Sequence, residues 1–157
     1  MATLKTLGAS VKQDFFGKKV IGVFKGMEIK PIPAKGDRPA TNLFIMKYVS
    51  PDIVDQMLDV VLGAGSINID MLSKCLKAMN KGEGVDPMEV DIPTFDKDKQ
   101  IKPDWQIQVL LSIGERKLTK WKDKVTGEER ETYSKFYEVV NVEPLAAMQE
   151  ATPFNTL

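Results

Sequence analysis

Residues 105–113 read Trp-Gln-Ile-Gln-Val-Leu-Leu-Ser-Ile, and this stretch decides the expected fold class. Apolar side chains occupy every second position, at Trp105, Ile107, Val109, Leu111 and Ile113. In a strand this spacing places them on one face, so the stretch predicts a half-buried β-strand. Residues 136–142 are the expected partner strand, with Phe136, Val140 and Val142 on a shared face.

Two more strands are expected in the first third of the chain, over 20–29 and 42–49, where β-branched and aromatic residues dominate. Gly22 and Gly26 interrupt the first of them. Glycine inside a strand indicates a bulge, a bend or the close approach of another backbone. Residues 30–40 hold three prolines and a glycine, which predicts an exposed loop.

Two helices are expected between these strands and the strand at 105–113. Ser50 followed by Pro51 is typical of a helix start, and apolar residues continue at helical spacing to about residue 61. A second helix is expected over 69–79, with Gly82 after its end. The apolar stripes of both helices predict core or, alternatively, a dimer face. Residues 83–104 are acidic and are expected to form a long loop.

This order of elements predicts one domain that is mainly β with one or two helices inserted between strands, an α+β fold. We expect a flexible arm over 1–17, the domain over 18–143 and a C-terminal tail over 144–157. The chain of 157 residues, 43% of them hydrophobic, is long enough to bury one core.

The chain contains no histidine and one cysteine, Cys75. Ser-His-Asp and Cys-His catalysis, zinc sites of His and Cys, and an internal disulfide are therefore excluded. We expect no catalytic residues, no metal, no cofactor and no enzymatic activity. No apolar run approaches the ~18 residues of a membrane span, and the first residues lack a signal-peptide pattern. We therefore expect a cytoplasmic protein without a membrane partner, in the host cytoplasm if the chain is viral.

Charge is balanced over the whole chain, with 22 Lys/Arg and 22 Asp/Glu. The distribution is uneven, because residues 1–50 hold nine Lys/Arg and three Asp/Glu, whereas residues 51–104 hold six and eleven. A balanced total argues against a polycationic binder. It still allows a local positive groove, since charges act over a Debye length of about 10 Å.

Trp121 lies among basic residues in the segment between the two strands, namely Arg116, Lys117, Lys120, Lys122 and Lys124. Flat rings beside cations are what a surface needs to hold unstacked bases and their phosphates. The alternative is a solvated hairpin whose tryptophan packs on a neighbouring strand. Several acidic residues nearby favour that alternative, because they dilute the positive field.

Residues 105–142 resemble the last two strands of the OB-fold single-stranded DNA-binding proteins of bacteria and their phages. The residues that carry the resemblance are Gly114, Trp121, Asp123, Gly127, Arg130, Tyr133 and Glu138-Val-Val140. A strand followed by a helix precedes this hairpin in that family, as is expected here. The resemblance implies an OB-like five-stranded barrel that binds single-stranded DNA non-specifically in replication or recombination.

Carried over by position, the resemblance makes Trp121 a stacking residue. It implies phosphate contacts from Arg116, Lys117 and Lys120. The expected nucleic-acid-binding residues of this segment also include Lys122, Lys124, Arg130 and Tyr133. Lys35, Arg38 and Tyr48 complete the expected nucleic-acid-binding set, although Tyr48 and Tyr133 are also candidates for the core. The expected partners are single-stranded DNA, further copies of the chain, and replication or recombination proteins.

Two other functions stay open at this level. The first is a phage structural or protein-interaction domain whose hairpin docks a partner. The second is a magnesium nuclease built on Asp104, Glu115 and Lys117, whose spacing matches a known Asp/Glu/Lys arrangement. If 105–113 is one strand, Asp104 and Glu115 lie on the order of 35 Å apart, which disfavours a shared metal.

Overall fold

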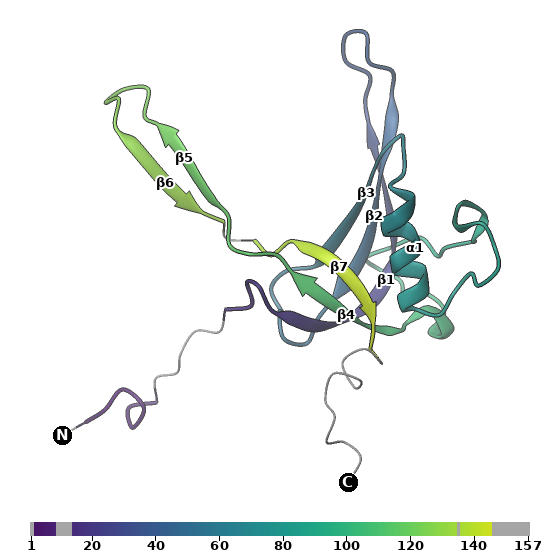
Figure 1. The fold of residues 1–157 in the computed structure, drawn as a ribbon, viewed down its shortest axis with the longest axis horizontal. Helices are drawn as coiled ribbons and strands as arrows, with labels where there is room; N and C mark the ends of the chain where they lie inside the picture. The colour runs from purple at the N-terminus through teal and green to yellow at the C-terminus, as the bar shows by residue number, and fades with distance from the viewer. Residues whose placement is uncertain (1, 9–13, 135, 146–157) are drawn as a thin grey trace.

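A computed structural model describes residues 2–8, 14–134 and 136–145. The described chain is mainly β, as expected, with one α-helix. Its five-stranded sheet consists of β1 (Lys19–Ile32), β2 (Thr41–Val49), β3 (Leu58–Ala64), β4 (Gln108–Ile113) and β7 (Val139–Pro144), all antiparallel, in the order β3-β2-β1-β4-β7. A separate two-stranded ribbon, β5 (Leu118–Lys122) and β6 (Glu129–Tyr133), projects from the sheet (Figure 1).

The central strand, β1, is shared between two partners. Its first residues pair with β4, and from Val23 onward it pairs with β2. A bulge between Phe24 and Gly26 shifts the register with β2, and Gly26 adopts a φ of +116°. The expectation that glycine in this strand signals a bulge and a close approach is therefore confirmed.

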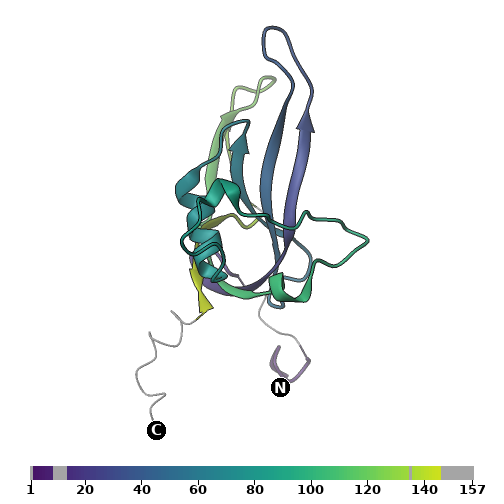
Figure 2. The same ribbon diagram turned by 90° about the vertical axis from the view of Figure 1, so that its right-hand side faces the viewer.

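The helix α1 (Ile69–Ala78) covers the gap between the two edge strands. The sheet curls so that β3 and β7 approach each other, but no hydrogen-bonded ladder joins them among the described residues. α1 contacts both strands and buries Leu72, Cys75, Leu76 and Ala78. Asn68 caps its first turn by accepting a hydrogen bond from the Met71 amide. Figure 2 shows the open curve of the sheet with α1 lying against it.

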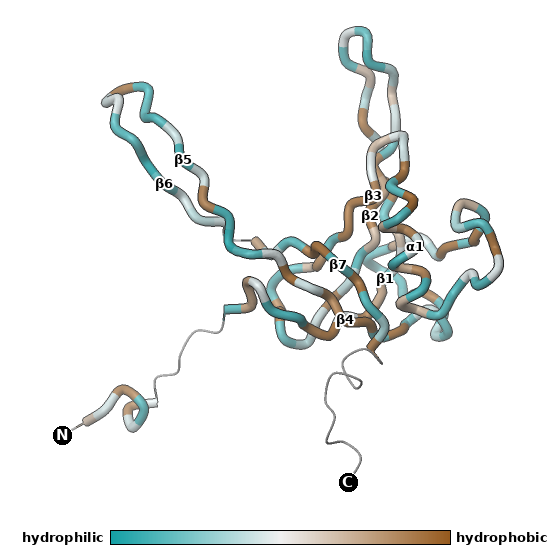
Figure 3. Tube along the Cα trace, in the orientation of Figure 1, coloured by the Kyte–Doolittle hydropathy of each residue, from teal (hydrophilic) through white to brown (hydrophobic). Residues whose placement is uncertain are grey.

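The core fills the inside of this curve. Three rings from different elements meet there: Phe24 of β1 lies 5.4 Å from Tyr48 of β2 and 6.0 Å from Trp105, measured between ring centroids. Trp105 belongs to a short 3₁₀ turn, Pro103–Trp105, that precedes β4. Of the alternating residues expected on one face, Trp105, Val109, Leu111 and Ile113 are buried and Ile107 is partly buried. The strand itself begins only at Gln108, and Leu110 on its other face is buried as well. Figure 3 shows apolar segments gathered in the sheet and a largely polar ribbon.

The prediction of a helix over 51–61 is wrong. Ser50 begins a turn, with its hydroxyl accepting from the Asp52 amide and its carbonyl from the Ile53 amide. Strand β3 follows, with Leu58, Val60 and Leu62 buried. Both period-two and helical patterns fit this segment, and pairing with β2 selects the strand. The second helix, expected over 69–79, is confirmed as α1.

The strand expected over 136–142 is displaced to β7, and of its expected inward residues Val142 is buried whereas Phe136 and Val140 are exposed. Phe136 lies outside the strand and is 73% exposed. A register shift at Ser112/Ile113 pairs Ile113 with Val139 and Ser112 with Asn141, so Val140 is skipped and faces solvent. A bulge of this kind reverses the alternation locally, and it leaves no mark in the sequence.

The loop between α1 and β4 is hydrogen-bonded to β1 next to the bulge. The Met27 amide donates to the Pro93 carbonyl, and the Phe95 amide donates to the Met27 carbonyl. A three-residue 3₁₀ helix, Pro87–Glu89, lies in its acidic part and is capped by the Asp86 carboxylate, which accepts from the Met88 amide. No described helix is long and apolar enough to cross a membrane.

Gly26→Ala should destabilise the protein. A Cβ at this position would lie 2.7 Å from the Phe95 amide nitrogen, and the backbone already has a positive φ. We expect the free energy of unfolding in urea to fall by about 1–3 kcal/mol or more, the range for forced backbone conformations. Gly36→Ala is the matched control, because Gly36 also has a positive φ but no atom lies near its Cβ position. Equal losses for both variants would contradict the role of the close approach.

Candidate nucleic-acid interface

The ribbon β5–β6 is built by local interactions at its tip. The Asp123 carboxylate accepts hydrogen bonds from the Val125 and Thr126 amides, and the Asp123 and Glu128 backbones are hydrogen-bonded. Gly127 takes the positive φ that this turn requires. Asp123 also forms an ion pair of 3.3 Å with Arg130. The short polar turn thus fixes the register in which Trp121 opposes Arg130.

Trp121 lies on an open face of the ribbon and is 47% exposed. Its indole N–H donates to the Thr132 hydroxyl at 3.3 Å, and the Arg130 guanidinium lies 5.9 Å from the ring centroid. These contacts hold the ring in place while leaving much of its surface accessible. Trp105, the other tryptophan, is buried in the core as expected.

The ribbon separates Trp121 from some of the cations next to it in sequence. Because side chains alternate between faces, Lys120 and Lys122 point away from the Trp121 face. They lie opposite Glu131 and Glu129 on β6. Arg130, nine residues away in sequence, shares the Trp121 face instead. The cross-strand neighbour Thr132 is a further residue of this face that sequence reasoning missed.

Most of the predicted cations on the ribbon carry a carboxylate partner. The ion pairs are Arg116–Asp14 at 2.9 Å, Lys117–Glu138 at 2.6 Å, Lys120–Glu131 at 3.7 Å and Arg130–Asp123 at 3.3 Å. No carboxylate of the described residues pairs with Lys122 or Lys124. Residues 114–134 hold six Lys/Arg and five Asp/Glu, and the pairing carboxylates Asp14 and Glu138 raise the acidic count to seven, so the ribbon and its base carry no strong positive charge.

Lys35 and Arg38 lie at the tip of a second projecting hairpin, formed by the ends of β1 and β2. Their backbones are joined by two hydrogen bonds of 3.1 Å, and both residues are exposed. The hairpin continues from the end of β1 at Ile32, whereas the ribbon follows β4 where Ser112 pairs with Lys19 at the start of β1, so the two arms project from different ends of this strand (Figures 1 and 2). The two groups of predicted cations are therefore presented on two separate arms.

Tyr48 does not belong to either arm. It is fully buried against Phe24, so the structure shows it as a core residue and it leaves the set of candidate contacts. Its hydroxyl lies by the Cys75 thiol, and burial, with a smaller effect of Cys75, raises the pKa of Tyr48 above its ordinary value. Tyr133, the other ambiguous tyrosine, is exposed at the base of the ribbon.

The residues considered for a magnesium nuclease do not converge. Strand β4 separates Asp104, which pairs with Lys81 at 3.7 Å, from Glu115. Lys117 pairs with Glu138. Within residues 2–8, 14–134 and 136–145, no group of three or more acidic or cysteine side chains could hold a metal ion.

Comparison of the chain with protein-family models, with curated proteins and with solved structures found no match.

Stability should fall at alkaline pH because of the buried thiol. Burial raises the pKa of Cys75 to about 11 from 9.0. The folded state therefore holds this proton more tightly, and stability is retained below pH 9 and lost as pH rises through 11. We expect urea denaturation to show a loss on the order of 2 kcal/mol by pH 11. The Cys75→Ala variant should be less stable than wild type at pH 7, but its free energy of unfolding should decline less steeply between pH 9 and pH 11. An equally steep decline would contradict the role of the Cys75 thiol.

Proposed function

We propose that this protein binds single-stranded DNA without strong sequence preference, through the ribbon β5–β6 and the tip of the β1–β2 hairpin. The observation that carries the proposal is the exposed indole of Trp121, held beside Arg130 on a projecting ribbon. Every base offers a flat face to such a ring, and stacking is therefore tolerant of sequence. The cations of both arms supply the phosphate contacts.

The arrangement of strands supports an OB-like reading of the domain. OB folds are five-stranded, partly open barrels that bind oligonucleotides with the loops between strands 1 and 2 and between strands 4 and 5. In this chain the first of these connections is the hairpin with Lys35 and Arg38. The second, between β4 and β7, contains the whole ribbon. Both connections that such folds use for binding are elongated here and carry exposed cations.

Ion pairs on the ribbon do not prevent phosphate binding. In three of these pairs both side chains are about half-exposed or more, and such pairs contribute only about 0–1 kcal/mol. In the fourth, Arg130–Asp123, the carboxylate is 21% exposed. A phosphate competes for the same lysine or arginine with a charge-assisted hydrogen bond. Because the positive field is weak, we expect moderate affinity that falls as the salt concentration rises. Self-association and contacts with replication or recombination proteins belong to the same proposal.

A protein-docking role for the ribbon is the second candidate. Its balanced charges and its two strand edges, which pair with no other described strand, suit a polypeptide partner as well as a nucleic acid. This candidate predicts that the ribbon binds no oligonucleotide at low salt and that a partner protein co-purifies with the chain.

Trp121→Ala should weaken binding of a thymine oligomer by about 1–3 kcal/mol, roughly 5- to 150-fold. The ring is half-exposed and lies outside the five-stranded sheet, so the thermal midpoint should stay close to that of the wild type. Tryptophan fluorescence titrations at two salt concentrations measure the wild-type affinity, because buried Trp105 should respond little. Fluorescence anisotropy of a labelled oligomer gives the affinity of the variant.

Val125→Ala is the matched control, since Val125 is an exposed apolar side chain at the tip of the same ribbon. It should leave affinity unchanged. The proposal fails if the wild-type protein does not bind the oligomer at low salt, or if Trp121→Ala binds as tightly as Val125→Ala.

A further inference from the structure

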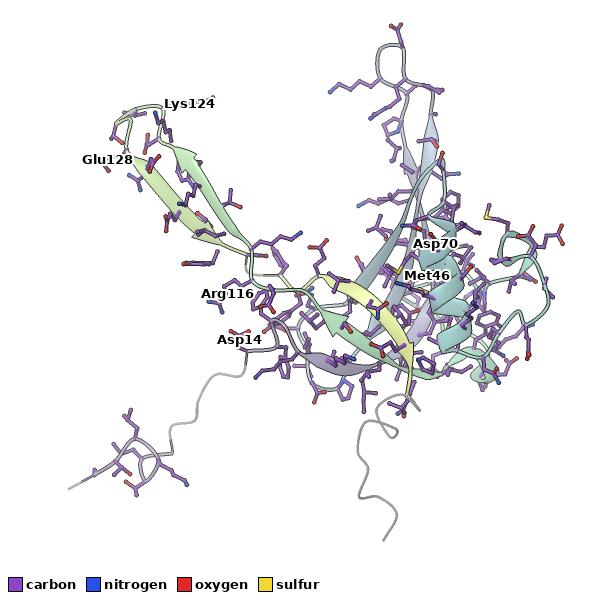
Figure 4. The ribbon with its side chains drawn as sticks, in the orientation of Figure 1. Asp14, Met46, Asp70, Arg116, Lys124 and Glu128 are labelled. Carbon is purple, nitrogen blue, oxygen red and sulfur yellow. The ribbon has the colours of Figure 1, made fainter. Side chains whose placement is uncertain are left out.

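Arg116, at the base of the ribbon, is held in an unusual environment. Its guanidinium lies 5.0 Å from the centroid of the Phe16 ring and 5.8 Å from that of the Tyr133 ring. One of its terminal nitrogens contacts the Asp14 carboxylate at 2.9 Å. Figure 4 shows Asp14 and Arg116 side by side where the ribbon leaves the sheet. The guanidinium is thus flanked by two rings and capped by one carboxylate.

The segment that supplies Asp14 and Phe16 is fixed to the domain, although the sequence placed it in a flexible arm. The Phe16 ring lies 4.6 Å from the Tyr137 ring, and the Phe15 amide donates to the Tyr137 hydroxyl. The Gly17 amide donates to the Gly114 carbonyl. Tyr137 is itself held by two hydrogen bonds between its backbone and the Gln56 side chain. This network keeps Phe16 beside Arg116.

We propose that Arg116, between Phe16 and Tyr133, is a phosphodiester-binding subsite, and that the Asp14 carboxylate occupies it when no nucleic acid is bound. The inference rests on the proposed function and extends it. It adds Phe16 as a residue that positions the guanidinium and assigns Asp14 the role of a built-in competitor. Neither residue was among those expected from the sequence.

The energetics favour exchange of the carboxylate for a phosphate. The side chains of Arg116 and Asp14 are each about half-exposed, at 47% and 50%. Their ion pair therefore contributes little to the free energy of folding. The planar guanidinium fits a phosphate with two parallel hydrogen bonds, whereas the structure gives it one contact to Asp14. The flanking rings restrict the rotamers of Arg116 beforehand, which lowers the entropy cost of binding.

The position of the subsite suits a strand that also reaches Trp121. Arg116 precedes Trp121 by five residues, so their backbones are separated by roughly 16 Å along the ribbon. Tyr133 pairs with Leu118, so by the alternation that turns Lys120 away from Trp121 it lies on the opposite face of the ribbon from the indole, and a single strand that reaches both must pass around an edge of the ribbon. Removing the competing carboxylate should therefore strengthen binding even though no new contact is added.

The test is the affinity of Asp14→Asn for a thymine oligomer at low salt. We expect about two- to fivefold tighter binding than wild type, the equivalent of an exposed ion pair, and a smaller gain at high salt. Arg116→Gln should weaken binding, and in the Arg116→Gln background the Asp14→Asn change should have only the general effect of removing one negative charge. Thermal unfolding of each variant checks that the fold is retained.

Asp98→Asn is the matched control, because it removes the same charge from an exposed loop that lies outside the ribbon and its base. It should reproduce only the general effect of net charge. If Asp14→Asn binds no more tightly than Asp98→Asn while Trp121→Ala still weakens binding, the subsite is wrong and the proposed function stands. If wild type and all variants fail to bind the oligomer, both are wrong.

Discussion

The bend of β1 is the constraint on which the rest of the structure depends. This strand must pair with β4 along its first residues and with β2 along the remainder. Gly22 allows the Leu111 side chain to lie directly against the backbone, and Gly26 allows the same for the Phe95 backbone. A side chain at Gly26 would force the Phe95 backbone outward, whereas one at Gly22 would displace the Leu111 side chain. The bend therefore brings Phe24, Tyr48 and Trp105 together and directs the end of β1 into the hairpin that carries Lys35 and Arg38.

The buried core and the projecting ribbon of this molecule are stabilised in different ways. The large rings of β1, β2 and the turn before β4 are buried, and α1 covers the opening between the edge strands. The ribbon has no such core, and its strands are exposed along their whole length. Its shape depends on the Asp123 turn and on cross-strand pairs. Exposed rings and loosely paired cations on such an arm can exchange their partners for a ligand at little cost to stability.

Sequence patterns predicted the mainly β class, the strands around 20–29 and 42–49, and the helix over 69–79. These predictions rested on the periodic spacing of apolar residues and on the positions of glycines. They failed at 51–61, because Leu58 and Val60 satisfy a strand as well as a helix and only pairing with β2 decides between them. They also failed at Val140, because a bulge in the β4–β7 ladder changes which face is buried.

For the candidate site, the sequence by itself determined that the chain lacks histidine and places an aromatic residue among cations near residue 121. Tertiary structure decided which of those cations accompany the ring. Alternation along β5 turns Lys120 and Lys122 away, and antiparallel pairing brings Arg130 to Trp121. The tertiary structure also brings Asp14 and Phe16 into contact with Arg116, which lies about one hundred residues away in sequence. The physical reason is that proximity across a fold is set by strand pairing and packing, which local spacing does not encode.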